Sequence, residues 1–144
     1  MSASQLRIVA VVDVVSALAT DTIDGAVWLL DSNKDGGSTG EGTGLLTTTV
    51  QEGDELIWTT MSLECEAFAA IDAIEIDPTY CDVSRETYPG TDIAYWLGRV
   101  LKDPGASRVP YNLRFALGSR VSRMSLSGPA IIGGRTDVST EPAP

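Results

Sequence analysis

The chain has 144 residues, 43% of them hydrophobic, and a formal net charge of −10. This length and composition predict one packed domain, and no apolar run approaches the ~18 residues that a membrane-spanning helix needs. The excess of acidic groups repels phosphate, so we expect no nucleic-acid partner.

The chain contains no histidine. This absence excludes Ser-His-Asp and Cys-His catalytic arrangements, so an enzyme would have to rely on carboxylates, lysine or a metal. We therefore expect a protein that is not an enzyme. No basic segment precedes the first apolar run, and no cleavage site follows it, so we expect no secretory signal and a cytoplasmic location. Cys65 and Cys81 are expected to be unlinked thiols there, unless two strands bring them together.

The first two elements are expected to be strands. Residues 6–13 are rich in β-branched side chains, which favours a strand. The alternative is a buried helix that continues through residues 14–19. Residues 25–30 then alternate, which places Trp28 and Leu30 on one face of a second strand.

Period-two patterns continue through the rest of the chain. They predict further strands at Leu45–Val50, Glu55–Ser62, Ala67–Ile76, Tyr95–Leu101, Tyr111–Leu117, Val121–Leu126 and Pro129–Ile132. Gly53-Asp54 marks a tight turn, and the polar segment 77–92 is expected to be a long loop. Residues 133–144 are expected to form a disordered tail.

About eight strands with frequent turn signals and no strong helix indicate an all-β protein. We expect an antiparallel, jelly-roll-like β-sandwich that forms a single domain over residues 1–132.

Charge is distributed unevenly along the chain. Residues 1–92 hold 17 acids and 3 bases, whereas residues 93–144 hold 3 acids and 7 bases. One interpretation is that the basic late strands lie beside acidic early strands within one molecule. The other is association between copies through complementary patches. We expect a homo-oligomer.

One loop has the spacing of a cation site. Asp31, Asn33 and Asp35, followed by Gly36, fit the start of a calcium loop, in which alternating oxygen atoms surround a hard cation. An EF-hand would place glutamate at the twelfth position, where this chain has Gly42. The other interpretation is a polar hairpin loop with Asx-turns, so calcium is the one cofactor that the sequence suggests.

Three tryptophans are candidates for ligand binding. Trp28, Trp58 and Trp96 would together offer a platform on which sugar rings can stack. The alternative is that they pack in the core, because each lies in an alternating segment. If the tryptophans form such a platform, carbohydrate is the expected partner.

Several short sequence segments, which occur in the same order, resemble those of the bacterial AidA/PixA inclusion-body protein family. The resemblance covers roughly residues 6–132. The most specific block is 38–45, Ser-Thr-Gly-Glu-Gly-Thr-Gly-Leu, followed by the Gly-Asp turn of 50–58. The other blocks are generic strand patterns that occur in the same order: 8–13, 26–29, 95–96, 100–102 and 111–117. The chain departs from the family at Ser127-Gly128, where Trp-Asp is usual, and in a shortened segment at 20–24.

The resemblance implies a β-sandwich, intracellular inclusions in some members, and no established catalysis. On this basis we expect a divergent member that acts by self-association or as a structural or interaction component. The alternative is a carbohydrate- or small-ligand-binding module, with or without calcium.

Overall fold

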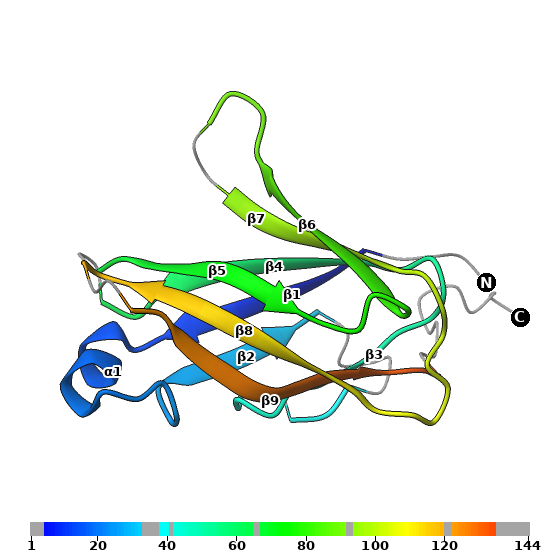
Figure 1. The fold of residues 1–144 in the computed structure, drawn as a ribbon, viewed down its shortest axis with the longest axis horizontal. Helices are drawn as coiled ribbons and strands as arrows, with labels where there is room; N and C mark the ends of the chain where they lie inside the picture. Colours follow the sequence, from blue (N-terminus) through cyan, green and yellow to red (C-terminus); the bar gives the residue numbers. More distant parts are fainter. Residues whose placement is uncertain are drawn as a thin grey trace, which may run out of the picture.

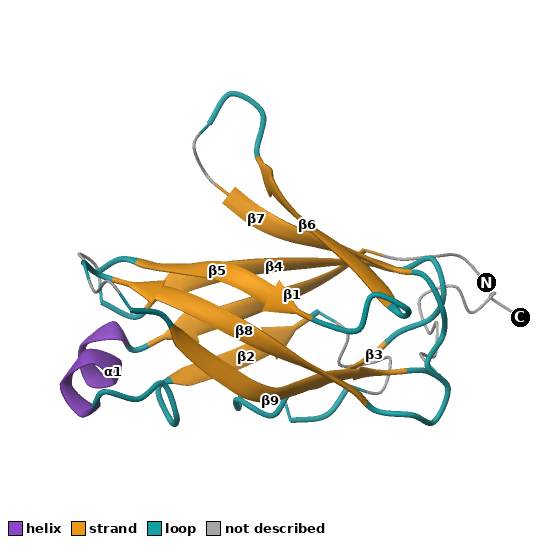
Figure 2. Cartoon of the chain, in the orientation of Figure 1, coloured by secondary structure: helices purple, strands orange, loops and turns teal. Residues whose placement is uncertain are grey.

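The computed structural model describes residues 5–32, 38–40, 42–64, 67–91, 94–119 and 122–134. Within these residues the chain forms nine strands in two packed sheets and one short helix (Figure 2). The elements are β1 Gln5–Val12, α1 Val14–Thr20, β2 Val27–Asp31, β3 Thr47–Thr49, β4 Glu55–Ser62, β5 Ala69–Glu75, β6 Cys81–Thr87, β7 Ala94–Val100, β8 Val109–Leu117 and β9 Met124–Ile132.

The two sheets form the expected all-β sandwich. The first sheet has the order β2-β1-β4-β7-β6 and the second has the order β3-β9-β8-β5 (Figure 1). The expectation of purely antiparallel sheets was wrong, because β1 pairs with β4 in parallel, and so does β3 with β9. Alternation places side chains on a face but carries no information about strand direction, so the sequence pattern could not distinguish the two arrangements.

Alternation in the strands builds the core between the sheets. In β8, Tyr111, Leu113, Phe115 and Leu117 are buried, as their period of two predicts. In β4, Leu56 and Trp58 point the same way into the core. Trp58 meets Tyr111 of the opposite sheet edge-on, with ring centroids 5.6 Å apart, and its indole N–H donates to the Tyr111 hydroxyl at 3.3 Å.

A glycine leaves the space that the Trp58 indole occupies. Gly98 of β7 lies opposite Leu56, and a Cβ atom built there would come within 2.7 Å of the Trp58 ring and 2.9 Å of the Cys81 sulfur. Neither neighbour can move away easily, because both are buried in a close-packed interior. Gly98 is therefore fixed by packing rather than by backbone conformation.

The helix α1 is a departure from the expected all-strand pattern. The Asp13 side chain accepts a hydrogen bond from the Ser16 amide at 3.0 Å and so caps the first turn. The pKa of the Asp13 carboxyl is lowered, first by a hydrogen bond with Glu64 and then by this cap. Val14 and Ala17 are buried one turn apart, which anchors a helix of only seven residues to the end of the sandwich (Figure 1).

The expected long loop at 77–92 was wrong over its central part, which forms β6. This strand pairs with β7 along its whole length, from Cys81 opposite Val100 to Thr87 opposite Ala94. It is an edge strand whose residues are mostly exposed, so its polar composition concealed it. The predicted strands 121–126 and 129–132 form one strand, β9, and positions 135–144 of the expected tail lie outside the described residues.

Cys81 carries a free thiol that is buried beside Trp58 and Gly98. Burial, with a smaller contribution from the Asp82 carboxylate, raises the pKa of this thiol from 9.0 to about 12. The thiolate is the reactive form of cysteine, so the folded protein holds Cys81 in an inert state. Cys65 lies outside the described residues.

The first prediction concerns the space at Gly98. The substitution Gly98→Ala should lower the free energy of unfolding by about 1–3 kcal/mol, because the added methyl group overpacks the core. Urea denaturation measures the change. Gly44→Ala is the matched control, since its Cβ would meet its nearest neighbour at an ordinary 3.4 Å. Equal stability losses in the two variants would contradict the packing argument.

The second prediction concerns Cys81 in a Cys65→Ser background. The folded protein should not react with a thiol reagent such as DTNB, whereas the unfolded chain should react fully. Above pH 9 the unfolded chain loses the thiol proton that the folded chain keeps, so the free energy of unfolding should fall as pH rises toward about 12. Cys81→Ala should show a shallower fall over that range. Rapid labelling of the folded protein would refute the assignment.

Candidate functional site

The outer face of the first sheet is unusually apolar. Val11 lies between Trp28 of β2 and Met61 of β4, and Val9 lies beside Leu30. Directly paired residues share a face, so these side chains all point away from the core. Ile57 and Leu97, a pair from β4 and β7, extend the same surface.

Several of these side chains are exposed to solvent. The exposed fractions are 37% for Trp28, 41% for Leu30 and 58% for Met61. Charged residues of both signs line one end of the face: Arg7, Glu55, Asp82 and Arg99, with Arg99 and Glu55 paired at 3.3 Å. The face is therefore an apolar patch with a mixed-charge border. We call it the outer face, defined by Val9, Val11, Trp28, Leu30, Ile57, Met61 and Leu97.

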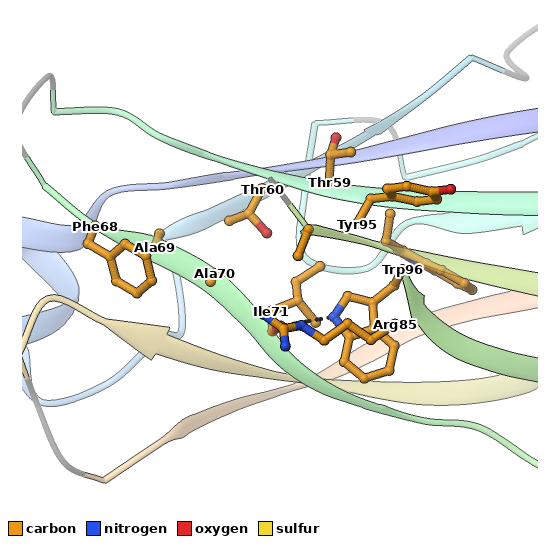
Figure 3. Close-up of a pocket in the computed structure, with 11 residues that line it drawn as sticks. Thr59, Thr60, Phe68, Ala69, Ala70, Ile71, Arg85, Tyr95 and Trp96 are labelled. Carbon is orange, nitrogen blue, oxygen red and sulfur yellow. Dashed lines mark hydrogen bonds between the residues drawn. The ribbon is translucent and has the colours of Figure 1, made fainter. Parts of the chain in front are cut away.

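A second feature lies on the inner side, where the β6–β7 hairpin leaves the sandwich (Figure 1). Pairing between β4 and β7 stops at Trp58 opposite Trp96, although β4 continues to Ser62. The strands separate beyond this pair and leave a cleft of about 290 Å³. Residues of β4, β5, β6 and β7 line it, among them Thr60, Phe68, Ile71, Arg85 and Trp96 (Figure 3).

Trp96 connects the hairpin to the other sheet. Its indole N–H donates a 2.9 Å hydrogen bond to the carbonyl oxygen of Ile71, across the cleft floor (Figure 3). Ile71 belongs to β5, the edge strand of the second sheet. The bond therefore satisfies a backbone acceptor at a sheet edge, which would otherwise be open.

The three tryptophans chosen from the sequence do not lie on one surface. Trp58 is only 1% exposed and belongs to the core. Trp96 is half-buried in the cleft, on the inner side of the same sheet, and Trp28 lies on the outer face. The structure brings Trp58 and Trp96 side by side and separates both from Trp28. Sequence reasoning missed Arg85 and Phe68, because neither belongs to a motif.

The loop proposed to bind calcium is described only in part. One carboxylate oxygen of Asp31 accepts a hydrogen bond from the Thr48 hydroxyl at 2.8 Å. Asn33 and Asp35 lie outside the described residues. Among the residues that are described, no three His, Cys, Asp or Glu side chains are grouped as metal ligands would be. Calcium at this loop stays a prediction.

The glycine-rich block of 38–45 has a structural role. The Gly42 amide donates to the Leu29 carbonyl, and the Leu29 amide donates to the Thr43 carbonyl, so the block pairs with the edge of β2. Gly40 has a φ of +79°, and a Cβ there would lie 2.6 Å from the Leu45 carbonyl oxygen. Gly40 is therefore required by this close backbone approach.

The early and late charges pair within the molecule, at least in part. Asp72 of β5 contacts Arg114 at 3.5 Å and Arg123 at 3.4 Å, and Glu55 contacts Arg99. These ion pairs support the intramolecular interpretation of the charge asymmetry. No helix in the described part of the chain is long and apolar enough to cross a membrane.

These features define a two-sheet β-sandwich with an exposed apolar sheet face and an aromatic cleft. The chain belongs to the family described as domain of unknown function DUF8788, whose model matches residues 4–122. Its fold is similar to the crystal structure of inclusion body protein PixA from Burkholderia cenocepacia J2315. That comparison has a TM-score of 0.67 and 16% identity, and it covers 92% of this chain and 93% of the other. No curated protein matches the sequence.

The likeness to PixA confirms the family resemblance of the sequence at the level of the fold. An identity of 16% is too low for site residues to be compared one by one between the two proteins. The function must therefore be argued from the surfaces of this chain.

A prediction concerns the bond between Trp96 and Ile71. Trp96→Phe should lower the free energy of unfolding by roughly 1 kcal/mol, because the Ile71 carbonyl loses its indole partner. Amide hydrogen exchange near Ala70 to Asp72 should become faster. Trp28→Phe is the control, since no described hydrogen bond involves its indole, and it should leave exchange in β5 unchanged. Identical exchange in β5 of the Trp96 variant would refute the role of this bond.

Proposed function

We propose that this protein is a non-enzymatic component that self-associates through the outer face of its first sheet. The observation that carries the proposal is the group of apolar side chains on the outward side of β2, β1, β4 and β7, in which Thr59 separates Met61 from Ile57. A strand that is apolar on both faces is typical of a sheet that is covered on both sides. The outward residues of β1 are Gln5, Arg7, Val9 and Val11, so its second half is such a strand, and the second sheet covers only its inner face.

The size of the outer face is consistent with a stable interface. The four strands, five to eight residues long and spaced about 4.8 Å apart, project an area of roughly 450 Å² with the charged border included. Side-chain relief increases the accessible area further, toward the ~800 Å² per partner that a standard interface buries. A second copy is the occupant we propose.

The charges at the border favour a copy of the same chain. Arg7 and Arg99 stand with Glu55 and Asp82 at one end of the face. A two-fold contact whose axis runs along the strands places this border against the same border of the partner, so opposite charges can be matched. The net charge of −10 on each copy opposes the approach at long range. Added salt screens that repulsion without weakening apolar contact.

The alternative hypothesis, a carbohydrate-binding module, has less support from the geometry. Its platform of three indoles is divided between the core, the cleft and the outer face. Carbohydrate binding stays a prediction, and a glycan array with and without chelator would test it.

The test of self-association uses charge substitutions of exposed apolar residues. The double variant Leu30→Lys/Met61→Lys should be monomeric in sedimentation velocity at concentrations where the native protein forms dimers or larger species. The control is Val15→Lys/Leu101→Lys, which makes the same charge change at exposed residues away from the outer face. It should associate like the native protein.

Salt provides a second measurement on the same samples. Association of the native protein should strengthen as ionic strength rises, because the repulsion between acidic copies is screened. A native protein that is monomeric at every concentration and salt level would overturn the proposal. If both double variants still associate, the interface does not lie on the outer face.

A further inference from the structure

The cleft beneath the hairpin continues into a neighbouring hollow. The second hollow has a volume of about 270 Å³ and shares Phe68, Ala70, Ile71 and Arg85 with the first. Together they form one groove across β5, which we call the Arg85 groove. Its size falls in the range of sites for small ligands.

The groove contains a guanidinium group, that of Arg85, which has no ion-pair partner among the described residues. Arg85 lies on the inner side of the hairpin, directly opposite Trp96 in the β6–β7 register. Figure 3 shows its side chain reaching from the hairpin toward Ile71. No carboxylate among the described residues lies within ion-pair distance of Arg85, whereas Arg99, Arg114 and Arg123 each contact one.

Among the described residues that line the groove, basic side chains outnumber acidic ones, although the chain as a whole is acidic. Among the described residues, Asp72 is the one carboxylate that lines the groove, and it already faces the guanidinium groups of Arg114 and Arg123. Arg85 and Arg123 are the two described cations in the lining, and Arg114 contacts Asp72 from outside it. An anion placed beside Arg85 therefore meets attraction from a local excess of positive charge.

The walls of the groove are apolar and aromatic. Phe68 lines both hollows, and 56% of its surface is exposed. Trp96, Tyr95 and Ile71 continue the wall, and Thr59 and Thr60 add hydroxyl groups. Aromatic walls favour a flat apolar body, since ring pairs add stabilisation beyond the burial of area.

We propose that the Arg85 groove binds a small aromatic carboxylate. The carboxylate accepts hydrogen bonds from the Arg85 guanidinium, whose planar fork matches its two oxygen atoms. The ring lies between Phe68 and Trp96. This site is separate from the outer face, because Arg85 and Trp96 occupy the opposite side of the sheet from Trp28 and Leu30.

The test is an NMR titration that uses the three indole N–H signals of the chain as reporters. Trp96 reports on the groove, Trp58 on the core and Trp28 on the outer face. The probe is 2-naphthoate. Neutral 2-naphthalenemethanol supplies the ring without the charge, and acetate supplies the charge without the ring.

We expect 2-naphthoate to shift the Trp96 signal and to leave the Trp28 signal in place. The neutral analogue should bind about ten-fold more weakly or worse, which is the scale of a lost charge-assisted hydrogen bond. Arg85→Gln should reduce affinity for 2-naphthoate to that of the neutral analogue. Arg99→Gln is the matched control, because it removes an exposed arginine on the outer side and should keep the native affinity.

A second variant separates the ring contact from the charge contact. Phe68→Ser should weaken 2-naphthoate and 2-naphthalenemethanol by similar factors, since both carry the ring. The proposal is overturned if 2-naphthoate leaves Trp96 unshifted, if it shifts Trp28 instead, or if Arg85→Gln binds as tightly as the native protein. Repeating the titration on Leu30→Lys/Met61→Lys makes the result independent of self-association.

Discussion

The contact between Trp58 and Tyr111 determines how the two sheets of this protein fit together. It joins the centre of one sheet to the centre of the other, and it combines an edge-on ring contact with a buried hydrogen bond. The large indole at this position needs the empty space of Gly98 on the neighbouring strand. Trp96, its direct partner in the register, lies beside it, and its indole N–H donates to the Ile71 carbonyl of β5.

The position of Trp96 explains why the hairpin separates from the sandwich. Before Trp58, a large inward side chain of β4 pairs with a small residue of β7, as Leu56 does with Gly98, so both strands fit in one sheet. Beyond it, the indole of Trp96 stands between β7 and the edge of β5, so β7 follows β6 rather than β4. The cleft is thus a consequence of core packing, and Arg85 enters it because it is the β6 residue paired with Trp96.

The sequence predicted strands well where apolar residues alternated strongly and the neighbouring strand was apolar too. The segments 55–62 and 111–117 were predicted to within two residues, and the two faces of 27–30 were assigned correctly. It failed at β6, whose polar edge shows only Cys81 and Val83 as inward apolar residues, and at α1, whose seven residues depend on the Asp13 cap. It also could not distinguish the three tryptophans, because register against neighbouring strands decides which face each occupies. Grouping the three tryptophans by residue type therefore joined side chains that lie on different faces of the sheet.

The residues that define the two proposed surfaces lie on opposite faces of one sheet, although the cleft also reaches Thr59 and Tyr95, which have the outward parity. Adjacent residues of β7 show this division, since Leu97 contributes to the outer face and Trp96 lines the groove. A copy bound to the outer face contacts the side of the hairpin that points away from β5. The mouth of the groove, with Phe68 and Arg85, faces the other way. Period-two alternation thus allows a single strand to serve an interface on one side and a ligand on the other.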